Sequence, residues 1–121
     1  MKHILSVSYD ENLLKTRELM LRQSGYQVTS ALGFMDAMDR CLTGTFDLLI
    51  VGHSIPHKDK QGLITKFRKQ CDAPVLVLKR HGEAQIEDAE FEAYPDNPVD
   101  FLETVGKVFG KGDGALRQQT S

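Results

Sequence analysis

Residues 46–56 read FDLLIVGHSIP, and this stretch decides the fold. Residues 48–51 form an uninterrupted run of leucine and β-branched side chains, which is the composition of a central parallel strand covered on both faces. The run ends at Gly52, and a loop that contains Pro56 follows. A second run of the same kind, PVLVL at residues 74–78, comes after a helical segment. The two runs predict central strands of a buried parallel sheet.

Strand and helix patterns alternate along the rest of the chain. Strands are expected at 3–7 and 26–31, and helices at 12–23, 34–42, 61–70 and 99–109, with a short fourth helix possible within 80–92. Alternation of this kind is typical of βαβ units with right-handed crossovers. The chain is therefore expected to be an α/β protein with a flavodoxin-like, doubly wound sheet of five parallel strands. We expect strand order 2-1-3-4-5, helices on both faces, a short or irregular fourth helix, and functional residues at the carboxyl ends of the strands.

Length and composition favour one ordinary globular domain. The chain has 121 residues, 40% of them hydrophobic and 26% charged. A net charge of −2 argues against nucleic-acid binding by this domain. No apolar run could cross a membrane and no signal peptide is apparent, so a cytoplasmic protein is expected. We expect a domain at 1–109, and the glycine-rich, polar segment 110–121 to be a flexible tail or linker stub.

Several catalytic and metal-binding chemistries are disfavoured. Cys41 and Cys71 lack C-x-x-C spacing and are expected to be small buried apolar groups. His53 and His57 would share a face only on a helix, and Pro56 before His57 favours a loop, so no metal site is expected. No G-x-S-x-G elbow, P-loop or flavin-phosphate loop is present. We therefore expect neither an enzyme nor a cofactor.

Several segments carry a resemblance to a known family over about residues 2–109. These are ILSVSYDE at 4–11, GYQV at 25–28, FDLLIV at 46–51 with the following Ile55-Pro56, Gly62, PVLVL at 74–78 and AYPDNP at 93–98. Together they resemble the receiver domain of bacterial two-component response regulators. The resemblance implies the flavodoxin-like fold, and a role in two-component signal transduction or a phosphorelay.

The chemical positions of that family are all replaced in this sequence. The resemblance places Ser8 and Tyr9 at the acidic pair, Gly52 at the phosphoacceptor aspartate, Lys79 at the switch hydroxyl and Asn97 at the conserved lysine. Magnesium prefers carboxylate ligands, and phosphoryl transfer needs that cation to neutralise developing charge. The chain is therefore identified as a degenerate pseudo-receiver that signals through protein contacts without phosphorylation.

Two local roles and two functional settings stay open. The ammonium of Lys79 could fill the emptied pocket or extend outward, and Asp10 could pair with Lys79 or, as we favour, cap the first helix. The resemblance suggests a protein partner or a homodimer on the face from the fourth to the fifth helix. The alternative is a receiver module of a larger regulator, for example with a DNA-binding output domain, gated without aspartate phosphorylation.

Overall fold

The computed structural model describes residues 1–110, so the predicted tail at 110–121 lies almost wholly outside the described residues. A single parallel sheet has the order β2-β1-β3-β4-β5. Its strands are β1 (His3–Ser8), β2 (Gln27–Leu32), β3 (Leu48–Val51), β4 (Val75–Leu78) and β5 (Phe91–Ala93). The predicted fold class and strand order are confirmed.

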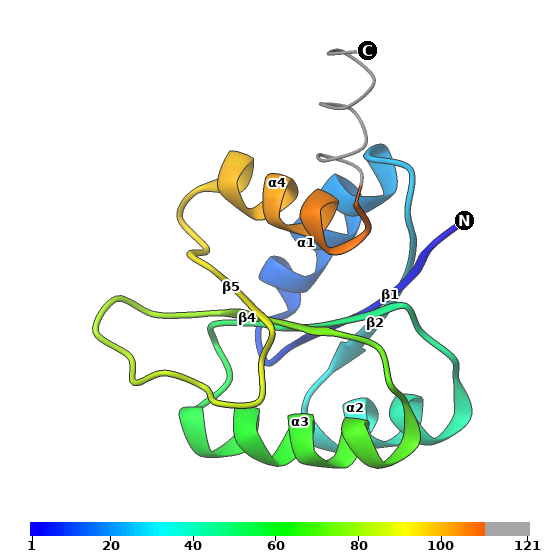
Figure 1. Ribbon diagram of the computed structural model, residues 1–121, viewed down its shortest axis with the longest axis vertical. Coiled ribbons are helices and arrows are strands. Elements are labelled where there is room, and N and C mark those ends of the chain that lie inside the picture. Colours follow the sequence, from blue (N-terminus) through cyan, green and yellow to red (C-terminus); the bar gives the residue numbers. More distant parts are fainter. Residues whose placement is uncertain (111–121) are drawn as a thin grey trace.

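Helices cover both faces of this sheet (Figure 1). They are α1 (Glu11–Gln23), α2 (Phe34–Thr43), α3 (His57–Gln70) and α4 (Pro98–Val108), the last being the helix predicted at 99–109. Helices α1 and α4 lie on one face, and α2 and α3 lie on the other. Each face has its own apolar cluster, with Phe67 of α3 in one and Phe101 of α4 in the other. None of the helices within residues 1–110 combines the length and the apolar character that crossing a membrane requires.

Helices α1 and α4 begin at side-chain caps. Asp10 Oδ1 accepts hydrogen bonds from the backbone N–H groups of Asn12 and Leu13 at 2.9 and 3.1 Å. Asn97 Oδ1 accepts one from the N–H of Asp100 at 3.0 Å. Such caps satisfy N–H groups that the first helical turn leaves unpaired. The predicted capping role of Asp10 is confirmed, and Asn97 has the same role at α4.

Helix α3 begins earlier than predicted. Pro56 is its N-cap residue with φ of −58°, and His57 is its first helical residue. A proline has no N–H to lose at a helix start, and its fixed φ suits the helix entry. The interpretation of His57 as a loop residue was therefore wrong, because Pro56 starts the helix instead of preventing it.

The expected short fourth helix is not formed. Residues 79–90, between β4 and β5, have turns and bends but no helix. Gly82 has φ of +83°, a left-handed conformation that interrupts helical geometry. Ile86 is buried and anchors this connection to the apolar cluster of α2 and α3. The segment is rich in charge and offers too few apolar side chains for a helical face.

The two cysteines lie on the α2–α3 side of the sheet. Cys41 is buried, and Cys71 is partly buried with its Sγ donating to the carbonyl of Phe46 at 3.5 Å. Both are free thiols. Burial, and to a smaller extent the neighbouring Cys71, raises the pKa of Cys41 to about 11. Cys41 is thus the small buried apolar group that was predicted, and Cys71 contributes to the same cluster from its margin.

Candidate functional site at the carboxyl edge of the sheet

The carboxyl ends of β1 and β3 are brought together by the sheet. Val7 is in register with Val51, and the N–H of Gly52 donates to the carbonyl of Val7 at 2.9 Å. Ser8 and Gly52 therefore lie side by side at the edge where the functional residues were predicted. Lys79 follows β4 at the same edge, and Asn97 lies further along at the start of α4.

The loops that follow β1 and β3 are tied together by hydroxyl groups. The buried Ser8 Oγ shares a hydrogen bond of 3.0 Å with Ser54 Oγ, which also accepts from the N–H of Tyr9 at 3.0 Å. Tyr9 Oη donates to Asp59 Oδ2 of α3 at 3.0 Å. Burial, and then the Asp59 carboxylate, raises the pKa of Tyr9 to about 12. Ser8 and Tyr9 therefore have structural bonding roles, and neither contributes a carboxylate.

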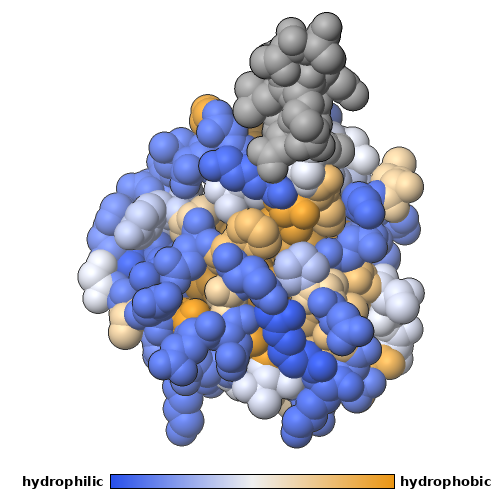
Figure 2. All heavy atoms as spheres, viewed as in Figure 1, coloured by the Kyte–Doolittle hydropathy of each residue, from blue (hydrophilic) through white to orange (hydrophobic). Residues whose placement is uncertain are grey.

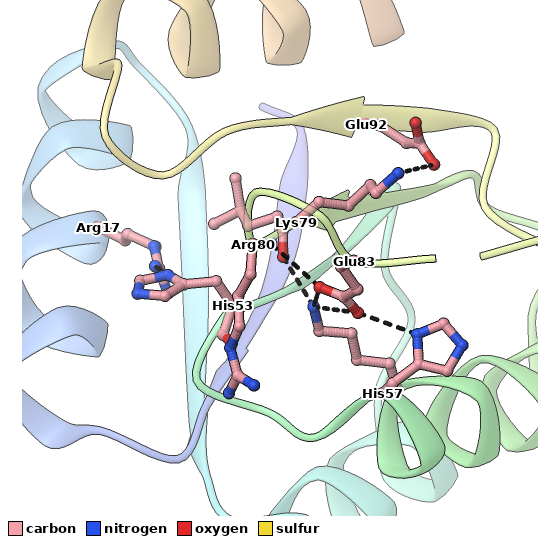
Figure 3. Close-up of polar contacts among 9 residues, drawn as sticks. Arg17, His53, His57, Lys79, Arg80, Glu83 and Glu92 are labelled. Atoms are coloured by element: carbon pink, nitrogen blue, oxygen red, sulfur yellow. Dashed lines mark hydrogen bonds and ion pairs between the residues drawn. The ribbon is translucent and has the colours of Figure 1, made fainter. Parts of the chain in front are cut away.

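An arginine of α1 occupies the space where a side chain at Gly52 would lie. A Cβ at Gly52 would be 2.7 Å from Arg17 Nη1 and 2.9 Å from the carbonyl oxygen of Val7. Arg17 is only 6% exposed, and its Nη2 is 2.8 Å from Nδ1 of His53 (Figure 3). In the described part of the chain, Nη1 is buried and has no hydrogen-bond partner. Among residues 1–110, no carboxylate forms an ion pair with Arg17.

Arg17 keeps its charge in this position. Burial lowers its pKa to about 10, and the nearby Asp10 carboxylate opposes that change. A guanidinium with this pKa is still protonated at neutral pH. Sequence reasoning missed Arg17, although its spacing was a signal: Leu14, Arg17 and Leu21 are the buried residues of α1 and recur at helical intervals of three and four.

Lys79 does not fill the space beside Gly52. Its side chain is 14% exposed, and its ammonium lies 3.7 Å from Glu92 Oε2 on β5 (Figure 3). The cation beside Gly52 is instead the guanidinium of Arg17. Neither of the two roles predicted for Lys79, filling the pocket or extending outward, describes this contact along the sheet.

A buried lysine of α3 holds the connection between β4 and β5. Lys60 is fully buried, and its Nζ donates to Glu83 Oε1 and Oε2 at 2.7 and 2.9 Å and to the carbonyl of Leu78 at 3.0 Å. Glu83 also accepts from the N–H of Arg80 at 3.0 Å and pairs with His57 Nδ1 at 3.1 Å (Figure 3). This network joins α3, the end of β4 and the following loop.

The same network keeps Glu83 ionised far into the acid range. Burial alone would raise its pKa, but hydrogen bonds from Lys60, Arg80 and His57 outweigh burial and lower the pKa to about 2. Burial lowers the pKa of Lys60, and Glu83 offsets part of that change. Lys60 was also missed by sequence reasoning. Its signal was again spacing, because it precedes the buried Leu63, Ile64 and Phe67 on one face of α3.

His53 is held neutral between cations. Burial, followed by the positive charges of Arg17, Arg80 and Lys60, lowers its pKa below the usual 6.5. Arg80 Nε also donates to the backbone carbonyl of His53 at 2.8 Å. The neutral ring can accept the hydrogen bond from Arg17 at Nδ1. Protonation of that nitrogen would remove the acceptor and place two cations side by side.

This arrangement predicts a stability that depends on pH near neutrality. Between the unfolded pKa of His53 and its lower folded pKa, the unfolded chain binds more protons, so the free energy of unfolding should fall as pH decreases below about 6.5. Urea unfolding at about pH 7.5 and about pH 5.5 measures the effect. His53→Gln should reduce this pH dependence, whereas the exposed His81→Gln should not. An unchanged slope in His53→Gln would contradict the assignment.

His53 and His57, for which no metal site was expected, have different partners. His53 contacts Arg17, and His57 contacts Glu83. Within the described part of the chain, no three His, Cys, Asp or Glu side chains are grouped so that they could hold a metal ion.

Comparison with known proteins identifies relatives among response regulators. No protein-family model matches the chain. It is 30% identical over 76 residues to the probable transcriptional regulator ycf27 of Cyanidium caldarium, covering 63% of this chain and 30% of that protein. It is 24% identical over 112 residues to the response regulator ArlR of Staphylococcus aureus, covering 89% of this chain and 51% of ArlR. The chain therefore spans about half or less of the length of these curated relatives.

Solved structures show the same fold. A chain in the crystal structure of histidine kinase ThkA with response regulator TrrA superposes with a TM-score of 0.77, at 24% identity, covering 89% of this chain and 98% of that chain. TrrA of Thermotoga maritima has also been solved with Mg²⁺-BeF, and there the TM-score is 0.74, at 23% identity, covering 89% and 99% of the two chains. A two-component response regulator from Clostridium difficile gives 0.78, at 17% identity, with both chains covered completely. This chain therefore has the fold of response-regulator receiver (CheY-like) domains and is similar to them in sequence.

Proposed function

We propose that this receiver domain works without aspartyl phosphorylation and regulates through protein–protein contacts. The resemblance assigns Gly52 to the phosphoacceptor position, and the observation that carries the proposal is the Arg17 guanidinium in the space where a side chain at Gly52 would lie. Glycine offers no nucleophile. A buried cation at that point also repels the magnesium ion that phosphoryl transfer requires.

The remaining positions support the same proposal. Ser8 and Tyr9, at the position of the acidic pair, bond to neighbouring loops through their hydroxyl groups. Two carboxylates that adjoin these residues are already engaged, since Asp10 caps α1 and Asp59 accepts from Tyr9. Lys79 and Asn97, at the switch positions, pair with Glu92 and cap α4. No residue at these positions offers the oxygen ligands that magnesium prefers.

The surface proposed for a protein partner is the face formed by residues 79–90, β5 and α4. The resemblance suggested a face from a fourth helix to the helix at 99–109. No helix forms between β4 and β5, so residues 79–90 take the place of the fourth helix, and α4 is the helix predicted at 99–109. His81 stacks on Tyr94 with ring centroids 4.5 Å apart, which joins the two loops of this face. Val99 is 66% exposed there. The surface seen in Figure 2 is mostly hydrophilic with smaller apolar areas, one of them beside α4, a mixture that suits a reversible protein contact.

A histidine kinase is one class of partner for this face or its neighbours. TrrA, whose fold this chain shares, has been crystallised with the kinase ThkA. A homodimer, a cytoplasmic location and a domain without enzymatic activity or cofactor stay predictions.

A second candidate function is a receiver module within a larger regulator. The chain spans only 51% of ArlR and 30% of the ycf27 regulator, so the relatives have room for a further domain. In that setting the domain would gate an output, such as a DNA-binding domain, without phosphorylation. The two candidates share the silent phosphoacceptor position and differ in what the domain is joined to.

Incubation with Mg²⁺ and acetyl phosphate tests the proposal. We expect no gain of a phosphoryl group by intact mass, and no saturable amide shifts at Ser8, Tyr9, Gly52 or Lys79 with Mg²⁺ and beryllofluoride. TrrA provides a positive control, because it has been crystallised with Mg²⁺-BeF. A magnesium-dependent acyl phosphate, or saturable shifts at these residues, would show that phosphorylation chemistry survives and would overturn the proposal.

A further inference from the structure

Arg17 contributes to a pocket that none of the receiver positions explains. The pocket has a volume of about 110 Å³ and lies between α1, the end of β4 and the start of α4. Its walls include Leu13, Arg17, Met20, Leu78, Pro95 and Phe101. Apart from Arg17 the lining residues carry no charge, so Arg17 is the one charged residue in the wall of a mostly apolar pocket.

The guanidinium of Arg17 is incompletely satisfied. The residue is 6% exposed, and within residues 1–110 its Nη1 has no hydrogen-bond partner and no carboxylate forms an ion pair with it. A buried charged donor that is left unpaired keeps its full desolvation penalty. The Asp10 carboxylate acts on Arg17 only at longer range, because it caps α1. An anion that reaches Arg17 would therefore gain a strong, charge-assisted hydrogen bond.

Size and polarity restrict that anion. An apolar cavity of about 150 Å³ holds a benzene ring, so about 110 Å³ suits a group of a few carbon atoms. Inorganic phosphate and sulfate have no apolar part to bury against Leu78 and Phe101. A dicarboxylate would leave its second charge in the apolar interior without a partner. A short-chain monocarboxylate fits both requirements.

We propose that the pocket between α1 and α4 binds a small monocarboxylate, with its carbon chain among the apolar walls and its carboxylate on Arg17. Arginine has a long, flexible side chain, so the guanidinium can turn from Gly52 toward the pocket while its stem stays packed. Two independent features, the pocket and the unpaired Nη1, meet at this one residue. The proposal goes beyond the signalling role and does not depend on whether the domain is phosphorylated.

Titration of the full 121-residue chain with sodium butyrate, followed by amide chemical shifts, tests this site. At constant ionic strength, butyrate should give saturable shifts at Thr16, Arg17 and Phe101, with a dissociation constant on the order of 1 mM for so small a ligand. Butyramide has the same carbon chain without the charge, and inorganic phosphate has the charge without the chain. Each should bind at least about tenfold more weakly, since each lacks one of the two interactions.

Three variants assign the interaction to the pocket. Arg17→Met keeps the apolar stem and should weaken butyrate binding about tenfold or more, whereas Arg22→Met, on the exposed side of the same helix, should not change it. Leu13→Trp fills the pocket and should block butyrate with Arg17 in place, which decides the matter if Arg17→Met does not fold. Equal binding of butyrate and butyramide, equal binding of phosphate, or full binding by Leu13→Trp would overturn the proposal.

Discussion

Glu83→Ala should lower the free energy of unfolding by about 3–5 kcal/mol, because it leaves the buried ammonium of Lys60 without its counter-charge. Lys60 is fully buried, and Glu83 binds it with both carboxylate oxygens. Three oxygens accept hydrogen bonds from Lys60 Nζ, and after the substitution the carbonyl of Leu78 is the one that remains. The lysine must then lose its proton, leave the interior or stay unpaired, and each outcome costs free energy.

Urea unfolding at neutral pH measures this loss, with two variants for comparison. Glu92→Ala breaks the Lys79 pair, whose carboxylate is 37% exposed, and should cost less than about 1 kcal/mol. Lys60→Met combined with Glu83→Leu removes both charges and should be closer to the wild type than Glu83→Ala alone. A loss below about 1 kcal/mol for Glu83→Ala would show that the pair contributes little. No recovery in the double variant would show that the loss does not come from the unpaired ammonium of Lys60.

The ion pair also bears on how the domain could signal. It joins α3 to the loop that replaces a helix between β4 and β5, and this loop forms part of the face proposed for a partner. A loop held by a buried ion pair has few alternative positions of similar energy. The network therefore favours a domain that presents one surface, in agreement with a role without a phosphorylation switch.

The sheet could be predicted because its signal is local. The buried runs at 48–51 and 75–78 are continuous in sequence, and their order follows from right-handed crossovers between parallel strands. The short helix considered within residues 80–92 does not form, and this has a physical reason. A segment with few apolar side chains has no helical face to bury, so its conformation depends on distant contacts such as Ile86 in the core and Glu83 on Lys60.

The site was only half predictable for a related reason. The positions of Ser8 and Gly52 followed from where the strands end, but the sequence analysis did not single out Arg17 and Lys60, because arginine and lysine side chains are usually exposed. Both lie at apolar spacings on their helices. What makes their burial possible is a set of partners far away in sequence, His53 for Arg17 and Glu83 for Lys60. Such partners become visible only in the folded chain.

Gly52→Asp should not make the domain a phosphoacceptor, although it places a carboxylate at the position that the resemblance assigns to the phosphoacceptor aspartate. The new Cβ would lie 2.7 Å from Arg17 Nη1 and 2.9 Å from the carbonyl oxygen of Val7, so the guanidinium and the strand end must both move. The carboxylate would then meet a guanidinium instead of magnesium, and an ion pair with Arg17 would hold the nucleophile. Ser8 and Tyr9 would still supply no carboxylate to bind the metal.

Intact mass after incubation with Mg²⁺ and acetyl phosphate measures this outcome, and Gly52→Ala is the matched control because it adds the same Cβ without the charge. Gly52→Ala should lower the free energy of unfolding by about 1–3 kcal/mol through overpacking, and Gly52→Asp should lose less if Arg17 pairs with it. Combining Gly52→Asp with Arg17→Ala removes the competing cation but does not supply the missing metal ligands. The double variant should therefore also remain unphosphorylated. A magnesium-dependent acyl phosphate in Gly52→Asp alone would mean that other oxygen ligands bind the metal. The domain would then be one substitution away from conventional receiver chemistry.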